Sequence, residues 1–179
     1  IAGIAAADYT NAMAAFETQT FNIMSLDGIT DPAIQTSVAS WAVRMRNQGK
    51  VMITVMGGPG ADDTAADAVQ KAIARTAGFN HEGIVNVGTG VVLDDVTYSS
   101  AQVAPYVAGL IAGQKLSEST TYAASPFDDV TRRWTRTEQE DAVRNGVFIF
   151  FHDGRIVKPL RGINSLITLR QGQSQFFKK

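Results

Sequence analysis

The chain has 179 residues, of which 45% are hydrophobic and 18% are charged, so it can bury one core and is too apolar to be disordered. It contains no cysteine and only two histidines, which excludes disulfide scaffolds, cysteine-ligated metal centres, cysteine nucleophiles and a histidine-rich metal site. The net charge of −1 excludes a polycation built for nucleic acid, although a local basic patch is still allowed.

The sequence carries neither a membrane span nor a signal peptide. No apolar run approaches the ~20 residues that cross a bilayer, and the first residues lack the basic start of a secretory signal. We therefore expect no membrane insertion. Because the first residue is Ile1 rather than methionine, we expect a fragment or a processed piece of a longer protein.

The first half of the chain predicts alternating helices and strands. The clearest helix follows Thr30 or Asp31 as its cap, has Pro32 at its first position and repeats apolar side chains along one face. A further helix is expected behind Asp62 or Asp63 as its cap. In chain order the expected elements are a helix at 8–19 capped by Asp8 or Thr10, a strand at 21–26, a helix at 31–49, a strand at 51–56, a helix at 64–78 ended by Gly78, a strand at 83–88 and an apolar run at 91–95.

The second half predicts two capped helices and a hairpin. Capping boxes at Ser99–Gln102 and at Thr137–Glu140 precede helices at 101–116 and 137–146, which a long loop separates. Asp153 and Gly154 then join two strand-like runs, a pattern typical of a hairpin with a two-residue turn. The two runs are 147–152 and 155–160, and a last strand candidate follows at 163–169.

These elements predict a mixed α/β sheet. Strands that alternate with helices form parallel sheets through right-handed βαβ crossovers, so we expect helices on both faces and α+β character at the C-terminal end, where the hairpin lies. We expect one domain over 1–179, with a βαβαβ half at 8–95 and a helix–loop–helix–hairpin half at 96–179.

Glycine-rich loops follow two of the expected strands. Gly57–Thr64 stands where a nucleotide-binding protein would hold phosphate, but it lacks the P-loop and dinucleotide motifs, and its two aspartates would repel an anion. The loop at Gly88–Asp95 ends in two adjacent carboxylates, which do not define a metal coordination shell. A small-ligand or nucleotide-binding α/β domain that uses these two loops is the alternative function.

The sequence predicts no enzyme. No serine stands in a G-x-S-x-G motif, and His81 and His152 are interpreted as a solvated turn residue and a strand-end residue. We therefore expect no catalytic residue, no cofactor and no metal.

A basic and aromatic cluster ends the long loop. Arg132, Arg133 and Arg136 flank Trp134, and the acidic residues around them would oppose a nucleic-acid backbone. A protein contact is the better functional interpretation, because Trp and Arg are frequent interface anchors. The alternative is that Trp134 fills the core with solvated arginines beside it.

Charge is divided unevenly along the chain. Residues 1–152 hold ten Lys/Arg and sixteen Asp/Glu, a balance of −6, whereas 153–179 hold six Lys/Arg and one Asp, a balance of +5. An acidic body with a basic end suits head-to-tail association between copies. The alternative is a basic edge hairpin whose charges discourage aggregation.

Three C-terminal motifs occur in a specific order. They are a small-residue helix with a Ser/Thr-rich segment at Ala104–Tyr122, a helix and strand at Thr137–Phe151, and a G-I-N-S-L motif at Gly162–Leu166. Together they resemble the contractile tail sheath proteins of phages and phage-tail-like bacteriocins. The run at 8–26 is similar to the start of the sheath's α/β domain, so the resemblance covers nearly the whole chain.

The resemblance implies a structural subunit rather than an enzyme. Sheath subunits form hexameric rings stacked around a tail tube, and contraction drives the tube through a target envelope. The implied partners are other sheath subunits, the tube protein, the baseplate and the tail terminator, within a virion or tail-like particle assembled in the bacterial cytoplasm. The resemblance also implies that both terminal segments and the outer domains of the subunit are missing here.

In this family terminal strands join a sheet on a neighbouring subunit. The apolar hairpin at Val147–Leu160 is our candidate acceptor, because an apolar strand at a sheet edge is a hazard unless another strand pairs with it. The expected subunit-interface residues are Arg132, Arg133, Trp134, Phe148, Phe150, Arg155, Lys158 and Arg161.

Overall fold

The computed structural model describes residues 4–115 and 117–168. Its centre is a four-stranded parallel sheet, in which the strand order β1-β2-β3-β7 follows the order along the chain. The paired residues include Met24 with Thr54 and Val85 with Val55. Along each strand, successive side chains point to opposite faces of the sheet. The strands are β1 (Ile23–Ser25), β2 (Ile53–Gly57), β3 (Ile84–Val87) and β7 (Val147–Phe148).

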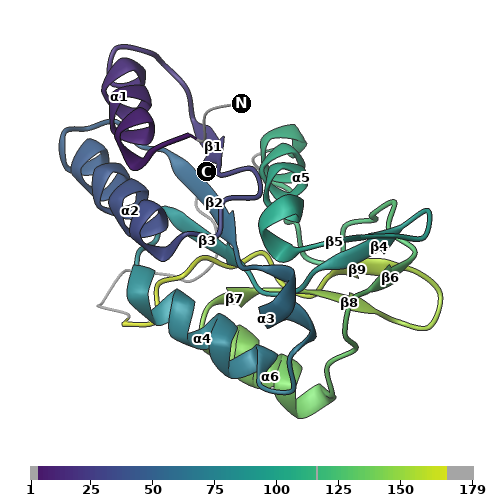
Figure 1. The fold of residues 1–179 in the computed structure, drawn as a ribbon. Coiled ribbons are helices and arrows are strands. Elements are labelled where there is room, and N and C mark those ends of the chain that lie inside the picture. Colours follow the sequence, from purple (N-terminus) through teal and green to yellow (C-terminus); the bar gives the residue numbers. More distant parts are fainter. Residues whose placement is uncertain (1–3, 116, 169–179) are drawn as a thin grey trace.

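Helices cover both faces of the sheet (Figure 1). On one face α5 packs its Val103, Val107 and Ile111 against Val55 and Val85 of the sheet. The other face is covered by α2 and α4, with α1 lying over α2 and α6 beside α4. The helices are α1 (Ala6–Phe16), α2 (Pro32–Asn47), α3 (Gly60–Thr64), α4 (Ala68–Phe79), α5 (Ser100–Gly113) and α6 (Arg136–Arg144).

The alternation of side chains along the strands explains this two-sided burial. Val55 and Val85 face α5, whereas the neighbouring Met56 and Ile84 join the cluster formed with α2. All four side chains are fully buried. A strand covered on both faces has to be apolar on both, which is why the strand sequences contain continuous apolar runs.

Two small antiparallel sheets continue from the ends of β3 and β7, on the right of Figure 1. One has the order β5-β4-β6, and the other is the hairpin β8-β9. Their strands are β4 (Val91–Leu93), β5 (Val96–Tyr98), β6 (Asp129–Val130), β8 (Phe150–His152) and β9 (Val157–Pro159). The parallel sheet, the helices on both faces and the C-terminal hairpin confirm the predicted fold class.

The hairpin is shorter than predicted. Val147 and Phe148 pair with β3 in the parallel sheet, and only Phe150–His152 pairs with β9. The strand changes sheets where the Phe150 N–H donates to Thr89 Oγ1, at 2.8 Å. The turn is also wider than two residues, because the Asp153 carboxylate accepts from the N–H groups of Arg155 and Ile156, at 2.9 and 3.0 Å.

The predicted starts of the helices at 8–19 and 137–146 are wrong. α6 begins one residue earlier than expected, at Arg136. Thr135 is its cap and Glu138 is the partner in the capping box, since Thr135 Oγ1 accepts from the Glu138 N–H. α1 is preceded by Ala5, whose N–H donates to Asp8 Oδ2 at 2.7 Å. The caps at Asp31 and Ser99 are confirmed.

The predicted helix at 64–78 begins later than expected, as α4 at Ala68, and a separate short helix, α3, precedes it. α3 and α4 are separated at 65–67, and Asp63 lies within α3 as a buried residue instead of acting as a cap. α4 continues past Gly78 to Phe79 and ends at Asn80 in a left-handed conformation, with φ 38°.

The last predicted strand is not formed in the described part of 163–169. There, Ser165 donates its N–H to the Ile84 carbonyl at 2.8 Å, and the Asn80 side chain accepts from the Ile167 N–H at 3.0 Å. These hydrogen bonds hold the segment beside the start of β3. Residue 169, like residue 116 at the predicted end of the helix at 101–116, lies outside the described residues.

Candidate functional site

The three predicted aromatic interface residues lie in the core. Trp134, Phe148 and Phe150 are only 6%, 0% and 2% exposed. Trp134 packs with Ala72 and Val147 under α4 and α6, as its core interpretation had it. These side chains therefore have almost no exposed surface for contact with a second chain. The sequence could not show this, because an apolar run looks the same whether its side chains are exposed or buried.

Arg132 and Arg133 fasten the loop that precedes α6. Arg132 Nη2 lies 2.7 Å from Glu138 Oε1, and Arg133 donates two bonds to the Asp129 carboxylate, at 3.2 and 2.8 Å. The Arg133 hydrogen bond holds the pKa of Asp129 below its ordinary value. Burial alone would raise the pKa of Glu138, but the bonds from the Thr135 N–H and Arg132 lower it overall.

Lys158 and Arg161 lie around an aromatic residue that sequence reasoning missed. The Tyr122 ring centroid is 5.5 Å from Lys158 Nζ and 5.4 Å from Arg161 Cζ. It is 6.0 Å from the Phe151 ring centroid, and the two rings pack edge to face. Such cation–π contacts stabilise by about 0.5–1 kcal/mol at exposed sites. Lys158 also pairs with Asp153, which lowers the pKa of that carboxyl.

Tyr122 is held in a conformation unusual for a bulky residue. Its φ is +59°, and its N–H donates to the Pro159 carbonyl of β9 at 2.9 Å. The side chain is nevertheless 50% exposed. The only sequence signal for it was a lone aromatic residue in a long loop, which is where binding residues often occur.

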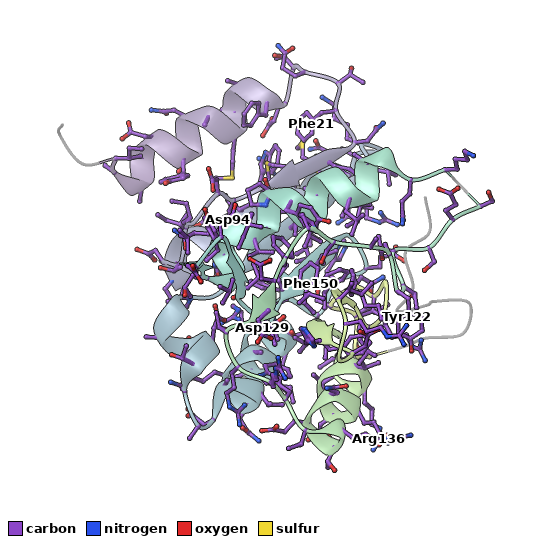
Figure 2. All side chains as sticks on the ribbon, turned by 90° about the vertical axis from the view of Figure 1, so that its right-hand side faces the viewer. Phe21, Asp94, Tyr122, Asp129, Arg136 and Phe150 are labelled. Carbon is purple, nitrogen blue, oxygen red and sulfur yellow. The ribbon has the colours of Figure 1, made fainter. Side chains whose placement is uncertain are left out.

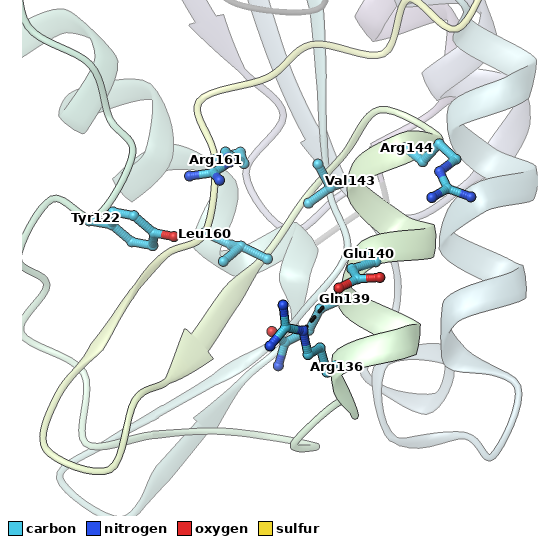
Figure 3. A pocket seen from close by; sticks show the side chains of 8 residues that line it. All are labelled: Tyr122, Arg136, Gln139, Glu140, Val143, Arg144, Leu160 and Arg161. Atoms are coloured by element: carbon cyan, nitrogen blue, oxygen red, sulfur yellow. Dashed lines mark hydrogen bonds and ion pairs between the residues drawn. The ribbon is translucent and has the colours of Figure 1, made fainter.

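A groove of about 720 Å³ opens between α6 and the end of β9 (Figure 3). Val143 and Leu160 supply its apolar part, and Arg136 pairs with Glu140 at 3.0 Å along its helical side. Three guanidinium groups and one carboxylate line it, which gives it a balance of +2. The lining residues are Tyr122, Arg136, Gln139, Glu140, Val143, Arg144, Leu160 and Arg161. We call this the α6–β9 groove.

The glycine loop after β2 is packed against the chain itself. A Cβ at Gly57 would lie 2.3 Å from the backbone carbonyl of Ser100, and one at Gly58 would lie 2.2 Å from Arg75 Nη1. Asp63 Oδ2 accepts from the Ser100 N–H at 2.6 Å, and Oδ1 from its hydroxyl at 2.7 Å. Gly57 thus admits the start of α5, and Gly58 admits the Arg75 side chain of α4, which weakens the case for a phosphate site at Gly57–Asp63.

The glycines of the loop at Gly88–Asp95 are also required by close packing against other parts of the chain. A Cβ at Gly88 would lie 2.3 Å from Val147 Cγ1, and one at Gly90 would lie 2.5 Å from the Tyr98 carbonyl oxygen. The close approach of protein atoms accounts for both glycines. The glycines of these two loops therefore give the alternative ligand-binding function no specific support.

Both histidines stabilise turns. His81 Nδ1 accepts from the Gly83 N–H and His152 Nδ1 from the Gly154 N–H, each at 3.0 Å. Burial lowers the pKa of His81. Within the described ranges, no three His, Cys, Asp or Glu side chains come close enough to hold a metal ion. Among the described helices, none is long and apolar enough to cross a bilayer.

A family model of the phage tail sheath protein central domain matches residues 2–165. Among curated proteins, YqbK and the phage-like element PBSX protein XkdK of Bacillus subtilis are each 30% identical, over 97% and 96% of this chain. The tail sheath protein of Clostridium phage phiCD119 is 30% identical over 61% of it. The chain spans about a third of the length of these relatives, between 31% and 34%.

Solved structures have the same fold. The sheath tail protein of Desulfitobacterium hafniense is 27% identical and covers 94% of this chain with a TM-score of 0.80, which is 37% of that protein. A sheath tail protein of Listeria innocua is 29% identical and covers 96% of this chain with a TM-score of 0.79, which is 36% of that protein. The contracted helical sheath of the anti-feeding prophage is 14% identical at a TM-score of 0.56, over 87% of this chain and 41% of that one, which is a likeness of fold alone.

Proposed function

Because the chain belongs to the phage tail sheath family, we propose that it is part of a structural subunit of a contractile tail sheath. The subunit polymerises around a tail tube and contracts to drive the tube through a target cell envelope. The observation that carries the proposal is the agreement with the D. hafniense sheath tail protein, at a TM-score of 0.80 over 94% of the chain.

The architecture suits a mechanical part. The sheet is covered on both faces, and the side chains of its inner strands are buried except for Ile53, which is partly buried. Close-packed interiors deform little, so such a body moves as a unit while the segments that connect it to neighbours bend. A protein that transmits force between neighbours needs no reactive side chains, and we propose that this one is not an enzyme.

The proposed partners follow from the same role. They are other sheath subunits in hexameric rings of a helical stack, the tail tube protein, the baseplate and the tail terminator. The acidic balance of 1–152 opposes a nucleic-acid partner. The proposed location is the tail of a virion or a phage-tail-like particle, assembled in the host cytoplasm.

The test is self-assembly of the full-length protein that contains this chain. We expect sedimentation velocity to show concentration-dependent growth beyond a monomer, and negative-stain microscopy to show rings or tubes. A full-length protein that stays monomeric at all concentrations and salt conditions would overturn the proposal. A saturable thermal shift with micromolar nucleotide would instead favour the ligand-binding alternative.

A further inference from the structure

The tip of the β4–β5 hairpin is acidic and exposed. Asp94 and Asp95 form the turn, both left-handed with φ of 49° and 62°, and Val96 beyond them is 50% exposed. Asp128 lies beside them, because its Oδ2 accepts from the Asp94 N–H at 2.8 Å. None of these three carboxylates pairs with a cation among the described residues. We call this turn with Asp128 the acidic tip.

The backbone of the acidic tip is unusual for its sequence. Left-handed conformations cost an L-residue roughly 1–2 kcal/mol, less for aspartate than for most, and glycine would remove that cost. Two adjacent aspartates therefore place two negative charges on a narrow projecting turn, where a less charged pair would form the same turn at least as well. An unpaired charge of this kind is available to a partner.

The α6–β9 groove has the complementary properties. Its balance is +2, and Arg136 at its mouth has a side chain that is 92% exposed. Tyr122 and Leu160 add apolar surface beside the guanidinium groups. Tyrosine and arginine beside an apolar patch are the residue types that dominate binding energy at protein interfaces.

The acidic tip of one molecule cannot fill the groove of the same molecule. In Figure 2, Asp94 lies to the left of the centre of the molecule, whereas Tyr122 and Arg136 lie on its right-hand side. A contact between tip and groove therefore joins two copies through two different surfaces. Such a heterologous contact repeats from copy to copy and generates rings or helical stacks.

We propose that the α6–β9 groove binds the acidic tip of a second copy of this chain. Carboxylates of Asp94 and Asp95 meet the guanidinium groups of Arg136 and Arg161, while Val96 packs towards Tyr122 and Leu160. Opposite charges fix the orientation of the two copies, and like charges at the same place oppose a wrong docking. The inference rests on the proposed function, since it names the surfaces through which neighbouring subunits meet.

Charge reversal in the full-length protein tests the contact. Asp94→Lys/Asp95→Lys and Arg136→Glu/Arg161→Glu should each weaken self-association at least about tenfold, measured by sedimentation velocity at low salt. The quadruple variant, which carries both charge reversals, should assemble again, because the charges of its tip and groove are complementary once more. Asp94→Asn/Asp95→Asn is the matched control for the turn: it keeps residues suited to left-handed backbone and should weaken association less than the lysine pair.

Cysteine cross-linking tests the contact in the 179-residue chain even without polymer formation, since this chain has no cysteine of its own. A mixture of Asp95→Cys and Gln139→Cys chains should form a disulfide-linked heterodimer on mild oxidation. Replacing Gln139→Cys by Gln48→Cys, which lies exposed at the end of α2, should reduce the yield at least fivefold. Circular dichroism verifies that each variant is folded.

The outcomes separate this inference from the proposed function. Rings or tubes formed equally well by both reversal variants would overturn the tip-and-groove contact and leave the sheath role standing. Equal cross-linking of Asp95→Cys with Gln139→Cys and with Gln48→Cys would also overturn it. Specific cross-linking in a protein that never polymerises would support the contact and contradict the sheath role.

Discussion

Asp63 is the residue whose environment differs most from what its sequence context suggests. It is 2% exposed and accepts two hydrogen bonds from Ser100, which connect α3 to the first turn of α5. Burial raises the pKa of Asp63 from 3.8 to about 6, against the effect of the Ser100 hydrogen bonds and of the nearby Arg75 charge. In the folded chain this carboxyl therefore keeps a proton at a pH where the unfolded chain has lost it.

The sign of the pH effect follows from that difference. The stabilising contribution of protonated Asp63 is fully present below pH 3.8 and is lost as pH rises through about 6. We expect the difference in unfolding free energy between wild type and Asp63→Asn to shift in favour of wild type as pH falls from 7 to 5. The shift over this range is about 1.4 kcal/mol, since little is gained above the folded pKa of about 6 and each pH unit below it adds about 1.4 kcal/mol.

Urea unfolding of both proteins at pH 5, 6 and 7 measures this difference. Carboxyls with lowered pKa values, such as Asp129, act in the opposite sense at lower pH, but they are common to both proteins and cancel. A difference between the two proteins that does not change with pH would contradict the assignment.

Gly57 is required by packing. Gly57→Ala would bring a methyl group within 2.3 Å of the Ser100 backbone, which cannot rotate away. We expect a loss of about 1–3 kcal/mol or more in unfolding free energy. Gly78→Ala is the control, because it lies in α4 with nothing within 4 Å of a new Cβ, and it should stabilise by up to about 1 kcal/mol. Equal unfolding midpoints of the two variants would refute the packing account.

At the scale of elements, the start of α6 distinguishes the observed cap from the predicted one. Thr135 Oγ1 accepts from the Glu138 N–H, whereas Thr137 lies exposed in the first turn. Thr135→Ala should therefore cost about 1 kcal/mol, and Thr137→Ala should change stability by less than about 0.5 kcal/mol. Thermal unfolding monitored by circular dichroism checks both, and the reverse order of the two effects would mean that the helix starts later.

Elements with local signals could be predicted, and those that depend on distant contacts could not. The Asp31 cap and the Ser99–Gln102 box are short-range patterns, and both are confirmed. The break between α3 and α4 accompanies a hydrogen bond that Asp63 accepts from Ser100, 37 residues away, for which the local sequence holds no sign. The division of 147–152 between two sheets similarly depends on Thr89, which precedes it by 61 residues.

The candidate site was predictable in the same partial way. The charges of Arg132, Lys158 and Arg161 were visible in the sequence, but their partners Glu138 and Tyr122 were not. The long loop gave no reason to single out Tyr122, since the cations around it are Lys158 of β9 and Arg161, which follows β9. Whether Arg155 and the other exposed basic residues contact a neighbouring subunit stays a prediction.

At the scale of the whole molecule, charge and shape divide the chain into an acidic projection and a basic groove on different sides. The tip belongs to the small β5-β4-β6 sheet, and the groove lies between α6 and the end of β9 (Figure 1). If the tip and groove join subunits, the contact is electrostatic in part, and added salt screens it since the Debye length falls from about 10 Å at 0.1 M to about 3 Å at 1 M.

We therefore expect assembly of the full-length protein to weaken between 0.1 M and 1 M sodium chloride. The Asp94→Asn/Asp95→Asn variant should show a smaller change over the same range, because fewer charges contribute. Light scattering at fixed protein concentration measures both. An identical salt dependence of the two proteins would show that the tip charges do not take part.

The most direct test of the sheath role is a cryo-EM reconstruction of the assemblies formed by the full-length protein. We expect rings stacked in a helix around an open centre, in which each subunit contains the fold of residues 4–115 and 117–168 as one body. Assemblies without rotational symmetry, or subunits in which this four-stranded sheet is absent, would contradict the account.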